Sequence, residues 1–233
     1  MNRYLFRKVK NIIPRISDTE LIALKSGTTC IDREIFNGIV KYPTYIENEK
    51  KIENNMVENL LHKYGNLGNI YPNEEHPKIF KYIGENKFLS FIIKEEYGGL
   101  QLSVNELSSV LTKITTMNPA LGVTIMVPNS LGPGELLQEY GTTQQKADFL
   151  PKLADGTYIP CFGLTGPNNG SDATGSIDEG VIKCNSNGEL EIHVSINKRY
   201  ITLAPVANLI GLAVRVKDPN NLLKEGVEGV TVA

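Results

Sequence analysis

The chain has 233 residues, of which 41% are hydrophobic, so it is long enough to bury one large core or two smaller ones. Charged residues make up 21% and the formal net charge is −2, a balance that gives no basic footprint for nucleic acid. No apolar run approaches the ~18 residues of a membrane-spanning helix, and the three scattered cysteines indicate neither a disulfide framework nor a metal site. We therefore expect a cytoplasmic protein that binds no nucleic acid and no metal.

The first sixteen residues form a basic arm. Five cations precede the first acid, Asp18, and apolar residues are interleaved with them: Arg3, Arg7, Lys8, Lys10 and Arg15 alternate with Leu5, Phe6, Val9, Ile12 and Ile13. Two interpretations stay open. The arm is either a solvated segment, or it contacts the anionic inner face of a membrane through Met1 to Arg15.

Helical periodicity runs from residue 17 to residue 157 and predicts an all-helical domain. Capping-box patterns begin at Ser17, Ser103 and Thr142. The clearest helix covers Ser103 to Thr116, because one apolar stripe repeats along it at helical spacing. Further helices are predicted over Asn48–Tyr64, Pro77–Asn86 and Pro119–Met126, and around Leu136–Tyr140 and Ala147–Leu153.

From residue 158 onward the pattern alternates instead. Leu190 to Asn197 predicts a half-buried strand, which the Asn185–Gly188 turn joins in a hairpin to Val181–Cys184. Further strands are expected at Tyr158–Phe162, Tyr200–Thr202, Leu209–Val216 and Gly229–Ala233. The predicted fold class is thus α+β, a helical domain over 17–157 followed by an antiparallel β domain over 158–233.

The stretch Phe162 to Asp172, F-G-L-T-G-P-N-N-G-S-D, combines turn-forming residues with the hydroxyls of Thr165 and Ser171. Such a loop is either an ordinary surface turn or a site for a polar ring edge or a phosphate. In the second case backbone amides and hydroxyls converge where few side chains intervene.

Several motifs together resemble the acyl-CoA dehydrogenase family in their order and spacing. They are Tyr140-Gly141-Thr142, Leu150-Pro151-Lys152-Leu153-Ala154, Leu164-Thr165-x-Pro167-x-x-Gly170-Ser171-Asp172 and Lys198-Arg199-Tyr200-Ile201-Thr202. Ile93–Leu100, Val127–Leu137 and Asn197–Pro205 resemble the large bacterial long-chain branch of that family. The similarity extends from about Ser17 to the last residue.

The resemblance implies a helical N-terminal domain, a β middle domain and a C-terminal helical bundle, with FAD held between the last two. The positions matching the family's cofactor-binding residues are Phe162, Leu164, Thr165, Ser171, Tyr200, Ile201 and Thr202. Thr165 would bond the pyrimidine end of the flavin, and Ser171 would lie between the cofactor and acyl-CoA. Tyr200 would flank the ring, and the Thr202 hydroxyl would approach N5.

The implied activity is α,β-dehydrogenation of a fatty acyl-CoA to a trans-2-enoyl-CoA in fatty acid β-oxidation. Hydride would pass from the β-carbon to flavin N5, and hydrogen-bond donors would stabilise the charge that grows on the ring. An electron-transfer flavoprotein is the implied electron acceptor, and the active form is expected to be a homo-oligomer.

Three departures from the family pattern qualify this expectation. Gly166 stands where most members have glutamate, and Leu203-Ala204 replaces a common asparagine-glycine pair. The family's catalytic glutamate belongs to the C-terminal bundle, so no catalytic residue is assigned and the truncated chain is expected to be inactive alone. The alternative is a non-catalytic or remnant fragment that binds flavin or acyl-CoA and needs a separate, complementing C-terminal half.

Overall fold

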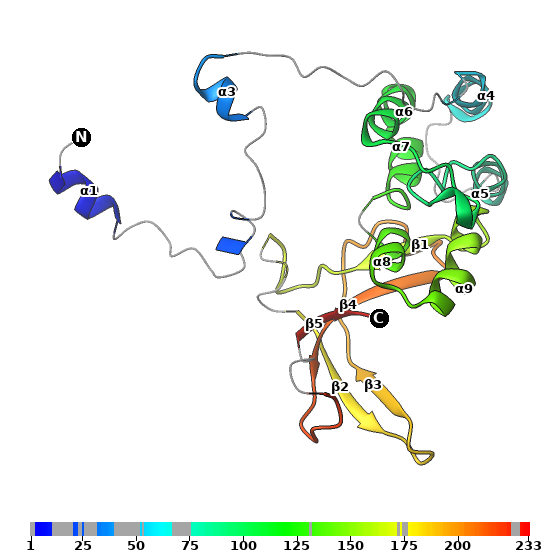
Figure 1. The fold of residues 1–233 in the computed structure, drawn as a ribbon. Helices are drawn as coiled ribbons and strands as arrows, with labels where there is room; N and C mark the ends of the chain where they lie inside the picture. The colour runs from blue at the N-terminus through cyan, green and yellow to red at the C-terminus, as the bar shows by residue number, and fades with distance from the viewer. Residues whose placement is uncertain are drawn as a thin grey trace. The chain divides into compact units, whose positions relative to one another are not determined.

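The computed structural model describes residues 3–10, 21–22, 25, 32–39, 52, 54–66, 76–130, 132–171, 173, 177–224 and 229–233. The chain divides into two compact units, Met1–Asn48 and Glu49–Ala233. The first unit contains the helices α1 (Arg3–Lys10) and α3 (Asp32–Phe36), neither of which has a buried residue (Figure 1). The capping pattern predicted at Ser17 lies outside the described residues, as does Asp172. No helix among the described ranges has the length and apolar character needed to cross a bilayer.

The helices of the second unit follow the predicted order. They are α4 (Asn54–Tyr64), α5 (His76–Glu85), the short 3-10 turn η1 (Glu95–Tyr97), α6 (Val104–Met117), α7 (Pro119–Met126), α8 (Pro133–Tyr140) and α9 (Thr143–Ala154). The capping boxes predicted at Ser103 and Thr142 are both confirmed. Each of these side chains accepts from the backbone N–H three residues on, and the backbone N–H of the same residue donates in return to the side chain of Glu106 or Gln145. These reciprocal bonds satisfy amides that a helix start would otherwise leave unpaired.

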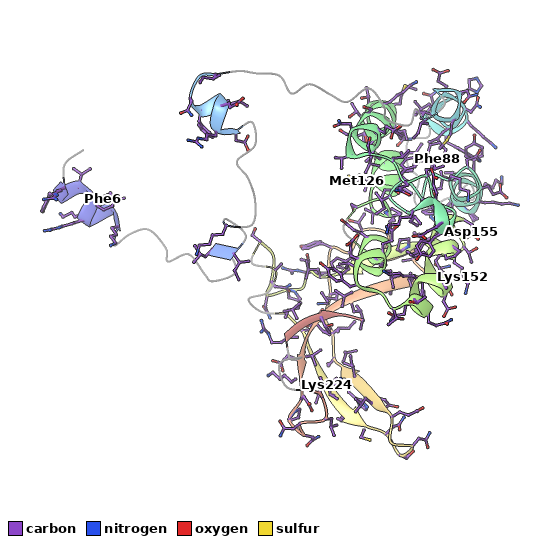
Figure 2. All side chains as sticks on the ribbon, in the orientation of Figure 1. Phe6, Phe88, Met126, Lys152, Asp155 and Lys224 are labelled. Carbon is purple, nitrogen blue, oxygen red and sulfur yellow. The ribbon has the colours of Figure 1, made fainter. Side chains whose placement is uncertain are left out.

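The main core lies among α4 to α7. Leu60, Ile79, Ile83, Ile114 and Leu121 are fully buried there. The segment between α5 and η1 adds the buried aromatic rings of Phe88 and Phe91, whose centroids are 5.7 Å apart (Phe88 is labelled in Figure 2). Cys161 and Leu203, from the β part of the chain, belong to the same cluster, so the helices and the start of the sheet share one core.

A buried amide fixes the segment between α5 and η1 to α7. Asn129 Oδ1 accepts from the N–H of Phe91 at 2.7 Å, and its Nδ2 donates to the carbonyls of Phe88 at 2.6 Å and Ile125 at 2.9 Å. The side chain thereby pairs backbone groups that have no strand or helix partner. Buried polar groups without such partners are costly.

The sheet consists of β1 (Pro160–Gly163), β2 (Glu179–Cys184), β3 (Leu190–Val194), β4 (Leu209–Lys217) and β5 (Gly229–Val232). β4 pairs in parallel with β1 and with β2, whereas β5 pairs antiparallel with β4 and β3 antiparallel with β2 (Figure 1). The α+β class is confirmed, but the sheet is mixed rather than antiparallel. Side-chain alternation is the same in both kinds of ladder, so the sequence pattern does not reveal strand direction.

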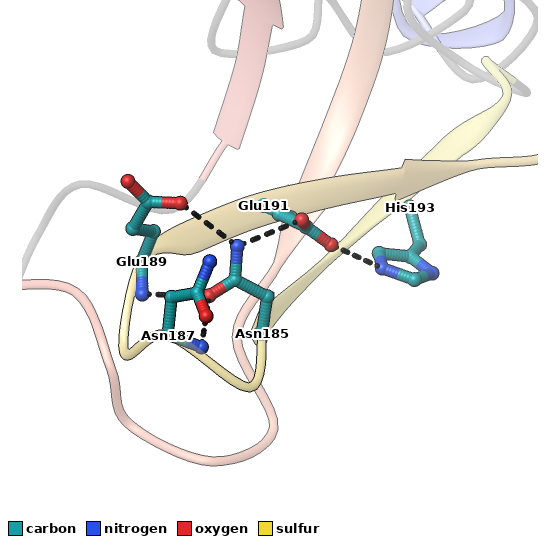
Figure 3. Close-up of polar contacts among 5 residues, drawn as sticks. All are labelled: Asn185, Asn187, Glu189, Glu191 and His193. Carbon is teal, nitrogen blue, oxygen red and sulfur yellow. Dashed lines mark hydrogen bonds and ion pairs between the residues drawn. The ribbon is translucent and has the colours of Figure 1, made fainter.

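The predicted β2–β3 hairpin is confirmed, and a polar cluster holds its turn (Figure 3). Asn185 Oδ1 accepts from the N–H groups of Asn187 and Glu189, each at 2.9 Å, and its Nδ2 donates to Glu191 Oε1 at 3.0 Å. His193 Nε2 lies 3.1 Å from Glu191 Oε2. Two side-chain hydrogen bonds lower the pKa of Glu191, the larger contribution coming from Asn185 and the smaller from His193.

Two further expectations for the strands are wrong. β3 was expected to be half-buried, yet every residue is exposed, with Leu190 at 52% and Ile192 at 40%. Alternation defines an apolar face, but a face is buried only where another layer covers it. Tyr200–Thr202 is an irregular segment instead of a strand, because Tyr200 adopts a φ of 59° and such left-handed backbone cannot continue a strand.

Replacing Asp218 should reveal an acid-sensitive contribution to stability. Hydrogen bonds from the backbone N–H groups of Leu222 and Leu223 lower the pKa of this buried carboxyl, whose Oδ2 lies 2.6 Å from Leu223 N. Because its pKa is lower in the folded state than in the unfolded chain, the carboxylate stabilises the fold at neutral pH. That contribution is lost as the pH falls from about 4 through the folded-state pKa.

We therefore expect Asp218→Asn to lower the urea midpoint at neutral pH and to reduce the further fall of that midpoint in acid. Glu139→Gln, which changes an exposed carboxylate on α8, is the control. An unaltered midpoint for Asp218→Asn at neutral pH would contradict the prediction.

Candidate functional site

The two segments predicted to bind a cofactor lie side by side in the structure. The Arg199 N–H donates to the Thr165 carbonyl at 3.1 Å, and Arg199 Nη2 donates to the Pro167 carbonyl at 3.3 Å. Lys198 Nζ donates to the Leu164 carbonyl at 3.2 Å. The loop after β1 is thus bonded to the residues directly before Tyr200.

Lys198 is the centre of this junction. Its side chain is only 8% exposed, and Nζ lies 2.8 Å from Asp178 Oδ2, 3.1 Å from the Ala213 carbonyl and 3.2 Å from the Leu164 carbonyl. These oxygens come from the residue before β2, from β4 and from the loop after β1. Two of the three ammonium donors thus bond to carbonyls, and the carboxylate of Asp178 balances the positive charge as an ion pair. A buried charge is stable only when it is paired in this way.

The loop after β1 is closed by a buried asparagine. Asn169 Nδ2 donates to the carbonyls of Leu164 at 3.0 Å and Ala173 at 3.2 Å. The backbone carbonyl of Asn169 accepts from the Gly166 N–H at 3.4 Å. A Cβ at position 166 would come within 2.7 Å of Asn169 Oδ1 and 3.0 Å of the Asn197 carbonyl. Asn169 therefore occupies the space that a side chain at position 166 would need, and position 166 is glycine here where most of the family has glutamate.

The second segment is anchored in the helical core through alternate residues. Ile201 packs against that core and Leu203 is buried in it, whereas Tyr200 is 81% exposed and Thr202 is also exposed. Leu203 has a φ of 68°, in the left-handed region that asparagine and glycine adopt more readily than leucine. Burial of the Leu203 side chain offsets this conformational cost.

A cavity of about 760 Å³ opens beside the second segment. Alternate residues of the parallel pair β1 and β4 form part of its wall, namely Cys161, Gly163, Ile210 and Leu212. Lys198 to Thr202 form another part. Burial raises the pKa of the Cys161 thiol, so this wall carries a neutral sulfur at neutral pH.

Of the seven predicted site residues, Tyr200, Ile201 and Thr202 line the cavity and the other four do not. Leu164 and Thr165 are half-buried in the adjoining loop, and Ser171 is exposed. Phe162 points to the opposite face of the sheet from Cys161 and Gly163, because side chains alternate along a strand. It lies there beside Gly211, which also faces Pro133 of α8. The roles of these residues stay predictions.

Sequence reasoning missed three residues that hold the site together: Lys198, Asp178 and Asn169. Lys198 was recognised only as part of a motif, and a lysine beside exposed polar residues gives no sign of burial. No group of three or more potential metal-binding side chains occurs in the part of the chain that the structure describes.

Comparison with known proteins agrees with this architecture. Residues 54–157 match the family described as "Acyl-CoA dehydrogenase, N-terminal domain". An acyl-CoA dehydrogenase of Bacillus subtilis is 33% identical over 137 residues, which cover 58% of this chain and 35% of that protein.

Solved structures show the same fold. Butyryl-CoA dehydrogenase from Megasphaera elsdenii aligns with a TM-score of 0.57 and 20% identity over 81% of this chain and 49% of that one. An acyl-CoA dehydrogenase complexed with FAD from Bacillus anthracis aligns with a TM-score of 0.58 and 20% identity over 75% of this chain and 32% of that one. The chain thus spans less than half the length of each of these proteins.

The chain therefore has the fold of the helical and β parts of those solved structures. The match over residues 54–157 to the acyl-CoA dehydrogenase N-terminal domain agrees with the resemblance noted in the sequence.

Lys198→Met should destabilise the fold strongly. The variant leaves Asp178 and two carbonyls without their shared donor, and breaking a buried ion pair in this way costs about 3–5 kcal/mol. Lys217→Met is the matched control, because Lys217 pairs with Glu179 at 2.6 Å while both side chains are about half exposed. An exposed pair contributes roughly 0–1 kcal/mol.

Urea unfolding of both variants measures this difference. Adding Asp178→Asn to Lys198→Met should recover part of the lost stability, since it removes the uncompensated charge. Equal losses for the Lys198 and Lys217 variants would contradict the assigned role of Lys198.

Gly166→Ala should be tolerated only when Asn169 is shortened. Overpacking against the Asn169 amide is expected to cost about 1–3 kcal/mol, whereas in an Asn169→Ala background the same change should cost much less. Gly170→Ala is the control, because a Cβ there meets no atom within 4 Å, and its effect should stay within roughly 0.5 kcal/mol. A double-mutant cycle of urea midpoints without coupling between positions 166 and 169 would refute this.

Proposed function

We propose that this chain forms the helical and β parts of an FAD-dependent acyl-CoA dehydrogenase that converts a fatty acyl-CoA into a trans-2-enoyl-CoA. The observation that carries the proposal is the junction at Lys198 and Arg199. It brings together the two segments that match the family's flavin-binding motifs, beside a cavity lined by the second segment. The Bacillus anthracis acyl-CoA dehydrogenase of the same fold is complexed with FAD, which supports FAD as the cofactor.

The residues around the cavity suit a flavin. A volume of about 760 Å³ falls within the usual range for small-molecule and cofactor sites, and such sites combine apolar walls with a few polar groups. Here Ile210 and Leu212 supply apolar wall, while Tyr200 and Thr202 supply an aromatic ring and hydroxyls. The bound cofactor would supply the hydride acceptor of the reaction.

The chain's own contribution is to hold and orient the reactants. Thr202 would donate a hydrogen bond from its hydroxyl, and the backbone around Thr165 would bond the polar end of the ring. Ile201 and Leu203, which pack in the helical core, would keep Thr202 in place. Preorganised donors of this kind stabilise developing charge without reorganising during the reaction.

The substrate and the partners follow from the same proposal. The resemblance to the large bacterial branch favours long fatty acyl chains, β-oxidation in the cytoplasm and electron transfer to an electron-transfer flavoprotein. The active assembly is proposed to be a homo-oligomer or a complex with a complementing C-terminal half.

Flavin binding tests this proposal. FAD is titrated into the purified chain, alone and with the C-terminal half of the Bacillus subtilis relative, and flavin fluorescence and absorbance are recorded. We expect Tyr200→Ala to weaken FAD binding roughly two- to tenfold, the range expected for losing one aromatic contact. Tyr140→Ala is the matched control, because Tyr140 is similarly exposed, at 83%, and lies outside this cavity.

No flavin signal in either arm of the titration would count against an FAD site. Equal effects of the two tyrosine substitutions would mean that flavin binds away from the cavity beside Tyr200.

A further inference from the structure

The helix α1 concentrates positive charge in a chain that is slightly acidic overall. Its eight residues, RYLFRKVK, include four cations and no acid, whereas the whole chain has a formal net charge of −2. All eight residues are exposed. The proposed dehydrogenase site uses none of them.

The helix gathers three of its cations on one face and its apolar side chains on another arc. With about 100° between successive residues, Arg3, Arg7 and Lys10 share one face at spacings of four and three. Leu5, Val9 and Phe6 occupy a separate arc of the helix, in which Phe6 borders Lys10 and Leu5 lies farthest from those three cations, and they are 59%, 44% and 59% exposed (Phe6 is labelled in Figure 2). An apolar face of this kind gains free energy only when another apolar medium covers it.

Tyr4 and Lys8 occupy one flank between the two faces. Lys8 Nζ lies 5.2 Å from the centroid of the Tyr4 ring. Both side chains combine an apolar body with a polar end, a combination that suits the boundary between water and lipid.

We propose that α1 is a docking surface for an anionic lipid bilayer. An eight-residue helix is about 12 Å long and the hydrocarbon core is about 30 Å thick, so the helix lies in the plane of the interface. Arg3, Arg7 and Lys10 meet anionic headgroups while Leu5, Phe6 and Val9 enter the acyl boundary.

A lipid surface explains both faces of the helix. A nucleic acid or an acidic polypeptide would pair with the cations, but a polyanion offers little apolar surface to cover Phe6 and its neighbours. The bilayer supplies negative charge and hydrocarbon within a few ångströms of each other. The inference is independent of the proposed dehydrogenase function.

Vesicle co-sedimentation of the full chain tests the proposal. We expect binding to vesicles of phosphatidylcholine mixed with phosphatidylglycerol, and much weaker binding to phosphatidylcholine alone. Each cation near such a surface contributes a factor of about five. The variant Arg7→Gln with Lys10→Gln should therefore bind about thirtyfold more weakly.

Two further variants separate the contributions. Lys94→Gln with Lys183→Gln removes the same charge from exposed positions elsewhere and should leave vesicle binding unchanged. Leu5→Ser with Phe6→Ser keeps every cation and should still reduce binding at least tenfold, because each apolar side chain that enters the bilayer contributes through its buried area.

Three outcomes would overturn the proposal. One is the absence of binding to the anionic vesicles. Another is equal loss of binding in the control lysine variant. The third is binding to polyaspartate or DNA that matches vesicle binding and is unaffected by Leu5→Ser with Phe6→Ser, which would identify a polyanion as the partner.

Discussion

The geometry of the site depends on one buried ammonium group. Lys198 joins the loop after β1, the central strand β4 and the residue before β2 through oxygens 2.8–3.2 Å away. These three segments are distant in sequence, so only long-range contacts such as these can hold them together. Because the ammonium charge is buried, moving any of these oxygens away would leave part of it unpaired, which costs free energy. The residue next to Lys198 in sequence, Arg199, continues the same junction with its backbone.

The helical core supplies the second support of the site. Ile201 and Leu203 are held among the helices, so the intervening Thr202 is directed outward. Tyr200 and Leu203 both have left-handed backbone, which is unfavourable for residues of their size. Conformations of this kind persist only where the surroundings determine them, and they are often found at functional sites. The segment is thus fixed from both ends, by Lys198 on the sheet side and by Leu203 on the helical side.

Much of the fold was predictable because its signals are local. The capping boxes at Ser103 and Thr142 and the turn at Asn185 each depend on neighbours within a few residues. The adjacency of the two segments predicted to bind flavin followed from family resemblance instead of from residue patterns. Strand direction, the exposure of β3 and the irregular backbone at Tyr200 depend on contacts between distant segments. The partners of Lys198 were equally inaccessible, because burial of a lysine is decided by what surrounds it and not by its own neighbours in sequence.

The central position of β4 has a consequence for how the chain is made. β1 and β2 both pair with β4. Pro160, in β1, therefore has no strand partner until Leu209 of β4 has been synthesised. At ribosomal rates of about 5–20 residues per second, those roughly 50 residues take about 2–10 s to emerge. The helices, whose contacts are mostly closer in sequence, can form during that interval. Nascent β1 and β2 therefore present unpaired edges for seconds, the period in which a chaperone would have most to protect.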